Sequence, residues 1–369
     1  MVAMTAGPGR ETRIDILRGL AMVVIAINHI TVAFQIYHLD GRGVPTPSSF
    51  GYSSSASIFV IMSGYMVGMV YQRKANPTAA VLRRAARLYV YDGLLLLAVT
   101  PVLAMMPAWE ATAWSADFLH RSPTEGLLLF LALLRAPTLL DVLQLYVIFM
   151  LVTPVALWLH RRSATLLVGV SVGLWLASQF ATLTGLLDPA VVEWKFNPAA
   201  WQIFFFVPML LGTRRAHERV FAYLEAHRTM TILLAVTVGA FAAAKLLHIE
   251  RHVPNSGLLT SKGNLGLLRL IHAPIIIAFY CGLLSWRRDL VASAPMRALA
   301  CIGRQTLYCY MATVWITYVL AALWYRAGGG YATYLGAVML AVLLTAAVAV
   351  VFDARARRTT AHRKLAITA

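Results

Sequence analysis

The segment RIDILRGLAMVVIAINHI (residues 13–30) is apolar enough to cross a membrane as a helix, yet it contains a charge and a titratable base, Arg18 and His29. The step from one to the other rises about 16 Å along a helix. If Arg18 lies near one face of a hydrocarbon core about 30 Å thick, His29 lies past its middle. Such residues are costly inside a membrane and mark a functional site by default. Two simpler interpretations stay open: Arg18 reaches toward the headgroups, and His29 only bonds a neighbouring helix.

Similar apolar segments recur along the whole chain of 369 residues, of which 60% are hydrophobic and 13% are charged. Soluble domains carry about 25% charged residues. The composition therefore predicts an all-α polytopic membrane protein, with about ten transmembrane helices in one bundle. The expected spans lie near residues 14–34, 53–72, 88–107, 139–160, 165–184, 200–213, 229–248, 269–286, 299–323 and 331–352. The stretch 126–136 is expected to be a re-entrant or interfacial helix.

The distribution of basic residues predicts the orientation. With a cytoplasmic amino terminus, 23 of the 32 Lys and Arg residues fall on the inner side, so both termini are expected in the cytoplasm. The net charge of +17 is then assigned to anionic lipid rather than to nucleic acid. We expect a polar leader without a cleavable signal at 1–13, one membrane domain at 14–352, and a disordered basic cytoplasmic tail at 353–369.

The first span offers a candidate catalytic group. Arg18 keeps its proton and needs an anion or a ring of acceptors. Asp15 lies three residues earlier on the same helical face and is expected to pair with it. His29 can act as a general base near neutral pH.

A cationic run precedes the third span, QRKANPTAAVLRRAAR (72–87). The guanidinium groups of Arg83, Arg84 and Arg87 suit phosphate, and the four-residue spacing places Arg83 and Arg87 on one helical face. A nucleotide-phosphate ligand held from the cytoplasm would use such a group. The competing interpretation is a topology signal that meets only lipid headgroups.

Polar residues gather near the predicted outer face. They are Asp141, Gln144 and Tyr146 in DVLQLY (141–146), Asn197, Trp201 and Gln202 in FNPAAWQ (196–202), and Lys262, Asn264, Arg269 and His272 in SKGNLGLLRLIH (261–272). Amides, an aromatic ring and cations around an outward opening suit a sugar, although tryptophan is also a common interfacial anchor. His272 is either a second catalytic group or a packing residue. Cys281, Cys301 and Cys309 are expected to be buried without a disulfide or metal role, and no metal-ligand spacing is found.

Several of these motifs, in order, resemble the OpgC family, the membrane succinyltransferases of osmoregulated periplasmic glucans within the larger superfamily of integral membrane acyltransferases. RIDILRGLA followed by NHI resembles the opening motif, with the superfamily's spacing between Arg18 and His29. FGYSSSASIFVIMSGYMVGMVY (50–71) resembles the second-span signature and contains Ser63-Gly64-Tyr65. DVLQLYVIFMLVTPVALWL, FNPAAWQ, GNLGLLRLIH and IGRQTL (302–307) follow in the family's order.

The resemblance implies a bacterial inner-membrane enzyme that takes acyl-CoA from the cytoplasm as a donor substrate, without a permanently bound cofactor, and acylates an outer glycan hydroxyl. His29 would be the base. Arg18, Arg83, Arg84 and Arg87, with Ser63 and Arg304 in matching motifs, would be candidate CoA contacts. Tyr65, Asn28 and Gln202 would be candidate oxyanion donors, and Arg269 or Lys262 would meet a succinyl carboxylate.

The chain departs from the family pattern in two places. Asn28 stands where the family commonly has Asp before the histidine, and Gln305 stands where it often has His. Two other classes of function remain open: a transporter of a glycan or lipid-linked sugar without CoA chemistry, and an enzyme that transfers acetyl or acylates another envelope glycan or lipid. A scaffolding role would leave the intramembrane Arg18 and His29 as costs without a use.

Overall fold

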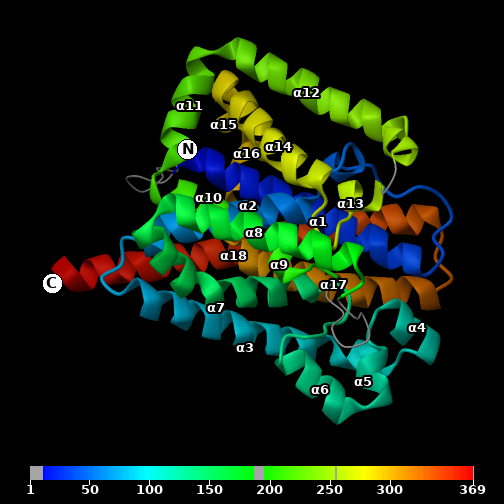
Figure 1. Ribbon diagram of the computed structural model, residues 1–369. Helices are drawn as coiled ribbons and strands as arrows, with labels where there is room; N and C mark the ends of the chain where they lie inside the picture. Colours follow the sequence, from blue (N-terminus) through cyan, green and yellow to red (C-terminus); the bar gives the residue numbers. More distant parts are fainter. Residues whose placement is uncertain (1–10, 187–194, 254–255, 369) are drawn as a thin grey trace. The chain divides into compact units, whose positions relative to one another are not determined.

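The computed structural model describes residues 11–186, 195–253 and 256–368. Within these ranges every regular element is a helix, and no strand occurs among them. Among the described residues, eight helices are long and apolar enough to cross a membrane, and two shorter apolar helices cover Ser55–Tyr71 and Pro198–Thr213. The predicted all-α polytopic membrane fold is confirmed (Figure 1).

The chain divides into two compact units. The first contains residues 1–49, 224–233 and 277–369, and the second contains residues 50–223 and 234–276. Three helices include residues of both units: α11 (Ala216–Ala226), α12 (Arg228–Leu246) and α14 (Leu267–Trp286).

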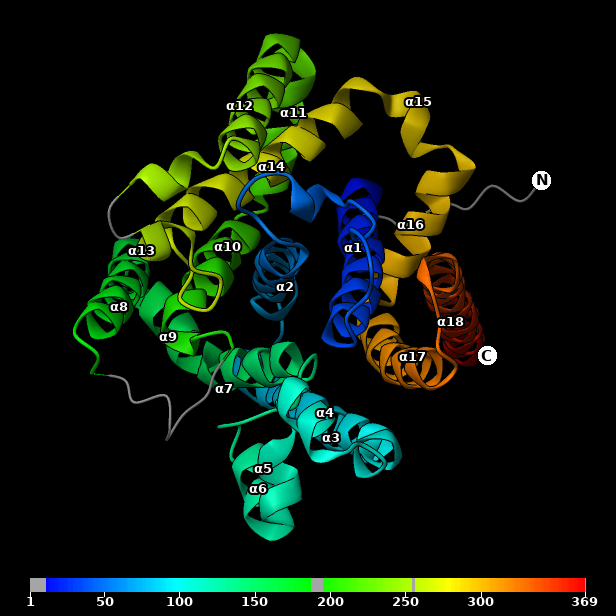
Figure 2. The same ribbon diagram turned by 90° about the vertical axis from the view of Figure 1, so that its right-hand side faces the viewer.

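The first unit is built around α1 (Thr12–Ile36), which packs against α16 (Ala294–Arg304), α17 (Thr306–Arg326) and α18 (Tyr331–Thr368) (Figures 1 and 2). The backbones of α1 and α16 touch directly, because a Cβ atom added at Gly303 would lie 1.8 Å from the Asp15 carbonyl oxygen. Any side chain at Gly303 would push these two helices apart. The short α15 (Arg288–Val291) precedes α16.

In the second unit, α2 (Ser55–Tyr71) and α10 (Ile203–Thr213) also make backbone contact. A Cβ atom added at Gly64 would lie 2.0 Å from the Phe205 carbonyl oxygen, and one at Gly212 would lie 2.0 Å from that of Tyr65. Small residues let the two helices approach this closely, as is common between membrane helices.

The other long helices of the second unit are α3 (Pro77–Ala104), α7 (Asp141–Arg162) and α8 (Ala164–Leu183), with α3 packed on α7 and α7 on α8. Shorter elements connect them: η1 (Pro47–Ser49) of the first unit leads into α2, and α4 (Ala108–Ala113), α5 (Asp117–Arg121), α6 (Pro123–Leu131), α9 (Pro198–Trp201), η2 (Ile249–His252) and α13 (Ser256–Thr260) belong to the second. Of the stretch 126–136, expected to be a re-entrant or interfacial helix, residues 126–131 lie in α6, which ends at Leu131.

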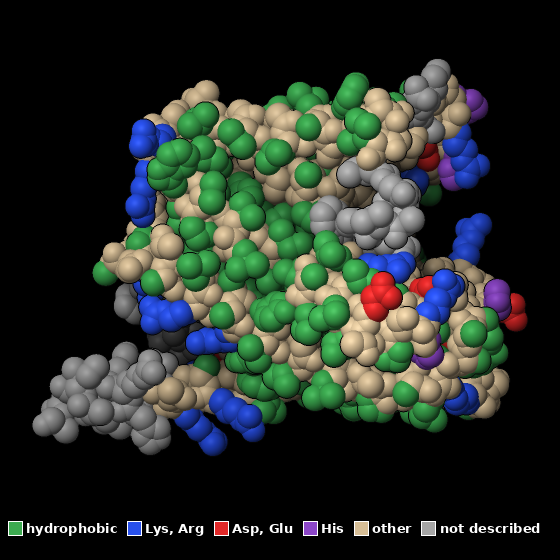
Figure 3. Space-filling model, turned by 60° about the horizontal axis from the view of Figure 1, so that its bottom comes forward, with side chains coloured by type: hydrophobic (Ala, Val, Ile, Leu, Met, Phe, Trp, Pro, Cys, Tyr) green, Lys and Arg blue, Asp and Glu red, His purple; other side chains and the backbone are tan. Residues whose placement is uncertain are grey.

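Hydrophobic side chains are exposed on several long helices. Leu97 of α3, Val236 of α12 and Leu343 of α18 are 68%, 64% and 62% exposed. On the face shown in Figure 3, hydrophobic side chains form much of the surface, and many Lys and Arg side chains lie toward its edges. Exposed leucine and valine along apolar helices are expected where the solvent is lipid.

Two predicted boundaries and the predicted disorder of the tail are wrong. α3 begins at Pro77 rather than near 88, because Asn76 caps it by accepting from the Ala79 N–H at 3.0 Å. The ninth span, expected from 299, divides at Gln305 into α16 and α17. The tail expected to be disordered is helical as far as Thr368, since no Gly or Pro interrupts it and Ala and Arg favour helix.

Most of the predicted leader, residues 1–10, lies outside the described residues, and α1 begins at Thr12. Cys281 and Cys309 are buried and Cys301 is half-buried.

Candidate functional site

In α1, Arg18 is held by two groups of the first unit. Its Nη2 donates to Thr306 Oγ1 at 2.7 Å, and its Nη1 lies 3.7 Å from Asp15 Oδ1. The Asp15 residue is only 3% exposed. A largely buried guanidinium needs an anion or polar acceptors, and Asp15 and Thr306 supply them. The predicted pairing of Arg18 with Asp15 is confirmed.

His29 lies farther along α1 and is half-buried, with its ring edge-on to Tyr310 of α17 at a centroid distance of 5.8 Å. Its neighbour Asn28 binds the loop before α2. Thr46 Oγ1 donates to Asn28 Oδ1 at 2.9 Å, and Asn28 Nδ2 donates to Ser48 Oγ at 3.2 Å. These two bonds hold the loop against α1, which is a different contact from the expected one to an oxyanion.

Arg304, expected to contact CoA, has an acidic partner within the first unit. Its Nε and Nη2 donate to Asp353 Oδ1 and Oδ2 at 2.8 and 3.0 Å. Arg357 binds the same carboxylate at 2.7 Å, and Gln305 Nε2 lies 3.5 Å from it. A two-pronged pair of this kind commits the guanidinium plane. In this structure Arg304 joins α16 to α18, which is a structural contact the sequence did not predict.

Positive charge is concentrated in a cavity at the start of α3. An open cavity of about 300 Å³ is lined by Tyr71, Lys74, Ala80, Arg83, Arg84 and Arg87. Four of these six residues are cations and none is an acid. Arg83 and Arg87 are exposed and Arg84 is half-buried. The predicted grouping of the three arginines is therefore observed, and the cavity can receive a multiply charged anion such as a phosphate ester.

Two of the three polar segments predicted near the outer face, 196–202 and 261–272, meet in the second unit. Asn197 Nδ2 donates to Asn264 Oδ1 at 2.9 Å, and Trp201 Nε1 donates to the Lys262 and Gly263 carbonyl oxygens at 3.0 Å. Asn264 Nδ2 also donates to the Ser178 carbonyl and to Thr182 Oγ1. Trp201 is fully buried. The structure uses these side chains to join the segments, which is a different role from the expected open sugar-binding surface.

Two buried amides of the second unit also bind backbone. Gln202 Nε2 donates to the Ser171 carbonyl at 2.7 Å, while its Oε1 has no hydrogen-bond partner in the described ranges. Gln144 Nε2 donates to the Phe130 carbonyl at 3.1 Å. Tyr146, which was predicted to line the same outer opening, packs against Phe205 with its ring centroid 5.7 Å away.

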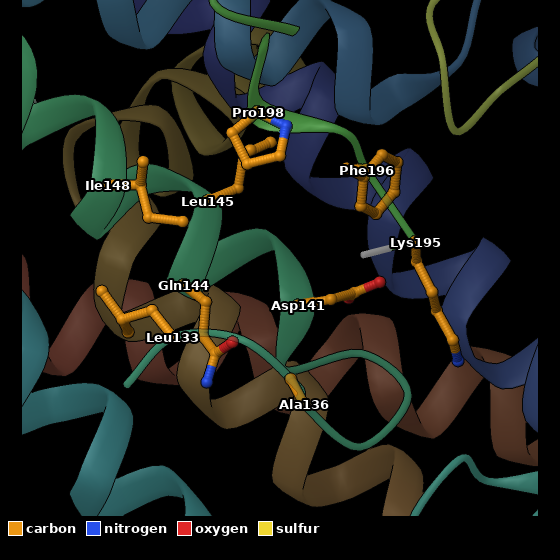
Figure 4. Close-up of a pocket in the computed structure, with 9 residues that line it drawn as sticks. All are labelled: Leu133, Ala136, Asp141, Gln144, Leu145, Ile148, Lys195, Phe196 and Pro198. Carbon is orange, nitrogen blue, oxygen red and sulfur yellow. The ribbon is translucent and has the colours of Figure 1, made fainter. Parts of the chain in front are cut away.

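A small pocket between α7 and the segment before α9 contains opposite charges. The Asp141 carboxyl faces Lys195 across it, with Phe196 on one side (Figure 4). Lys262 lies over the Phe196 ring, 5.2 Å from its centroid. Burial, together with the positive charges of Arg269 and Lys195, lowers the pKa of Lys262, and the Asp141 carboxylate partly opposes this.

Tyr65, expected to donate to an oxyanion, binds a histidine of α11. Its hydroxyl lies 2.5 Å from His217 Nδ1 and accepts from the His217 backbone N–H at 3.0 Å. Both residues are buried, so this Tyr65 hydroxyl is engaged in fixing α11. Ser63, two residues earlier on α2, is half-buried.

The last two predicted residues, Arg269 and His272, bind the chain just before α2. Arg269 Nη1 donates to the Tyr52 carbonyl at 2.6 Å and its Nε to the Thr260 carbonyl at 2.7 Å. His272 is fully buried, and its Nδ1 accepts from the backbone N–H groups of Tyr52 and Ser53 at 3.1 and 3.0 Å.

Glu250 of η2 completes this region, which we call the Tyr52 platform: Tyr52, Ser53, Lys245, Glu250, Arg269 and His272. Tyr52 Oη donates to Glu250 Oε2 at 2.8 Å, and Lys245 Nζ lies 3.3 Å from Glu250 Oε1. Burial alone would raise the pKa of Glu250, but the Tyr52 and Lys245 interactions outweigh it and lower the pKa to about 2. Burial and the bond to Glu250 raise the pKa of Tyr52 to about 12.

Sequence reasoning missed a buried acid in α3. Asp92 is fully buried, and its oxygens make no hydrogen bond within normal distance and angle limits in the described part of the chain, although the Gln144 amide lies nearby. The signal was available, because an aspartate inside an otherwise apolar span marks a functional site by default. Lys195 and His217 gave no such signal, since neither belongs to a recognisable motif.

The OpgC protein family model matches residues 10–357 of the chain. The chain belongs to the OpgC family. Membership in the OpgC family indicates a membrane acyltransferase that acts on glucans. No curated protein and no solved structure matches the chain.

Proposed function

We propose that this OpgC-family protein transfers an acyl group, succinyl, from cytoplasmic acyl-CoA to a hydroxyl group of an extracytoplasmic glucan. The protein would lie in the inner membrane of a bacterium, with both termini in the cytoplasm. His29 would be the general base, and the hydroxyl would attack the thioester directly.

The observation that carries this proposal is the cavity at the start of α3. Its lining contains Lys74, Arg83, Arg84 and Arg87 without an acid to neutralise them. Acyl-CoA carries several phosphate groups at its nucleotide end, and arginine side chains bind phosphate through paired N–H groups. The proposed orientation places this cavity on the cytoplasmic side, where acyl-CoA is found.

In the proposed reaction His29 takes the proton of the sugar hydroxyl as the oxygen attacks the thioester carbonyl carbon. The tetrahedral intermediate then expels the CoA sulfur, and the carbon–sulfur bond breaks. The thiolate takes the proton from the imidazolium, so His29 returns to its neutral form. The products are the glucan ester and free CoA thiol. A general base of this kind contributes about 10²- to 10⁴-fold to rate.

The direct test measures thiol release and glucan acylation by the purified protein in detergent, with succinyl-CoA and acetyl-CoA as donors. We expect transfer that depends on glucan, prefers succinyl-CoA and falls at least about 100-fold in His29→Ala. His38→Ala, a change at an exposed histidine just beyond α1, is the matched control and should retain activity. Full activity in folded His29→Ala would disprove the mechanism.

The same measurement separates the other functions. Preference for acetyl-CoA would replace succinyl by acetyl as the donor group. A folded protein that binds no acyl-CoA but moves a glucan across proteoliposome membranes would be a transporter, and the proposal would be wrong.

A further inference from the structure

His272 occupies a fixed position in the second unit. It is fully buried, one turn into α14, and its ring lies against Phe241 at a centroid distance of 4.5 Å. The chain before α2 wraps around the ring: Gly51 has a φ of +86°, and a Cβ atom there would lie 2.3 Å from His272 Cε1. Only glycine fits this close approach in this backbone conformation.

The hydrogen bonds to the ring determine where its proton lies. His272 Nδ1 accepts from two backbone N–H groups, those of Tyr52 and Ser53. A ring nitrogen that accepts cannot carry a hydrogen of its own. The neutral imidazole therefore carries its proton on Nε2, and a second proton on Nδ1 would displace both backbone donors.

The Nε2–H group has no acceptor in the part of the chain that the structure describes. The atom is buried, and no hydrogen-bond partner for it exists among the described residues. Buried polar groups are nearly always hydrogen-bonded, because an unpaired donor loses its water without compensation. An unpaired N–H in a fixed direction is therefore expected where a ligand supplies the missing acceptor.

The Tyr52 platform prevents the ring from turning to another partner. The Tyr52 N–H is bound to His272, its carbonyl to Arg269, and its hydroxyl to Glu250. All three polar groups of one residue are thus engaged, and Lys245 holds Glu250 in turn. Such support is typical of a preorganised binding group.

We propose that His272 is a substrate-binding residue, a neutral imidazole that donates Nε2–H to an oxygen atom of the substrate, and that it is not a general base. The inference rests on the proposed acyltransferase function. The acceptor oxygen belongs either to the acyl group, as its carboxylate, or to the sugar, as a hydroxyl. Arg269 and His272 bind the same residue, through the Tyr52 carbonyl and the Tyr52 N–H, and a cation near an N–H donor suits a carboxylate oxygen.

The kinetic test compares three variants. His272→Phe keeps an aromatic ring against Phe241 but has no N–H donor. His272→Gln keeps an amide donor near the position of Nε2. His252→Phe is the matched control, because His252 is exposed in η2.

We expect His272→Phe to lower kcat/KM about ten-fold, which corresponds to one lost hydrogen bond. We expect His272→Gln to recover part of that loss, and the control to behave like the wild-type protein. If the carboxylate is the acceptor, the loss is confined to succinyl-CoA and acetyl-CoA is used as before. If a sugar hydroxyl is the acceptor, KM for glucan rises equally with both donors. Unchanged kinetics with both donors and with glucan in a folded His272→Phe protein would overturn the proposal.

A second measurement uses the wild-type protein, so it depends neither on enzyme activity nor on the folding of a variant. In the ¹⁵N-histidine-labelled wild-type protein, NMR reports which ring nitrogen carries hydrogen. We expect a neutral His272 with a bare Nδ1 and a protonated Nε2, and a shift of the Nε2 resonance when succinyl-CoA or glucan is added. A protonated Nδ1, or no shift with succinyl-CoA, acetyl-CoA and glucan, contradicts the proposal. A wild-type protein that transfers no acyl group but shows the shift with glucan would refute the proposed function and leave this inference standing.

Discussion

Two groups of arginines that the sequence presents as equal candidates for CoA phosphate face different surroundings. Arg83, Arg84 and Arg87 line a cavity whose lining residues include no acid. Arg304 and Arg18 instead lie against the carboxylates of Asp353 and Asp15. An arginine paired with a carboxylate holds helices together. The charge of an arginine that faces an open cavity without an acid can instead attract an anionic ligand. What a cation faces, rather than which motif contains it, separates the two roles.

The largest effect is expected from the α3 group. Arg83→Ala combined with Arg87→Ala should raise KM for acyl-CoA at least about 100-fold, because each bond to a charged group contributes about 1.5–3 kcal/mol. The thermal midpoint of the protein should change little. Initial rates at increasing acyl-CoA concentrations in detergent measure KM, and a melting curve measures the thermal midpoint. Arg73→Ala, at an exposed cation that does not line the cavity, is the control; a KM increase equal to that of the double variant would remove the distinction.

The opposite pattern is expected for Arg304. Arg304→Ala leaves Asp353, which is 7% exposed, with Arg357 as its one cationic partner among the described residues. We expect a loss of about 1–3 kcal/mol and a melting midpoint lower by several degrees, with KM for acyl-CoA nearly unchanged.

The double variant Arg304→Ala, Asp353→Ala is the check on this pair, because removing both charges should recover part of the lost stability. If Arg304→Ala instead raised KM without a change in melting temperature, Arg304 would belong with the α3 group.

Ionic strength should also separate the groups. Exposed cations are screened by salt, since the Debye length falls from about 10 Å at 0.1 M to about 3 Å at 1 M. We therefore expect affinity for acyl-CoA to fall several-fold over this range. The stability difference between the wild-type protein and Arg304→Ala should change much less. Equal salt dependence of both quantities would mean that the two groups are equally exposed to solvent.

The smallest effect is expected in the pH dependence of stability at Glu250, an acid that pairs with Lys245. The pKa of Glu250 lies at about 2 rather than its ordinary 4.5. Because the folded state has the lower pKa, the stabilisation is fully present above pH 4.5 and is lost as the pH falls toward 2. Melting curves at pH 3 and pH 6 should show a smaller difference for Glu250→Gln than for the wild-type protein. A matched control is Asp40→Asn, at an exposed acid in the loop after α1.

Hydropathy and composition were enough to predict the all-α membrane fold and where most of its apolar helices lie, because apolar length is a local property of the chain; of the ten expected spans, two are covered by shorter apolar helices. Boundaries depended on finer chemistry. The Asn76 cap starts α3 eleven residues before the apolar run begins, and the turn at Gln305 divides one predicted span into two helices. Neither feature changes hydropathy, so a hydropathy pattern cannot locate it.

The candidate site was predictable where partners are close in sequence. The pairing of Arg18 with Asp15 and the grouping of the α3 arginines follow from helical spacing alone. The acid that binds Arg304 lies 49 residues away, and the backbone donors to His272 lie 219 and 220 residues away. Contacts of this kind depend on tertiary packing, which is why the sequence left the role of His272 open.

The backbone contact between α2 and α10 has a consequence for biogenesis. Ser55–Tyr71 and Pro198–Thr213 are each shorter than the other spans, and at 1.5 Å per residue each reaches about 25 Å, less than a hydrocarbon core of about 30 Å. A helix shorter than the hydrocarbon core is accommodated by thinning of the bilayer, by flanking side chains that reach the interface, or by association with other helices. During synthesis the Ser55–Tyr71 helix is made more than a hundred residues before its partner, so we expect it to associate with Pro198–Thr213 only after that later segment has been made. A bulkier residue at Gly64 or Gly212 would separate the two helices, and we expect such a variant to accumulate in the membrane in smaller amounts than the wild-type protein.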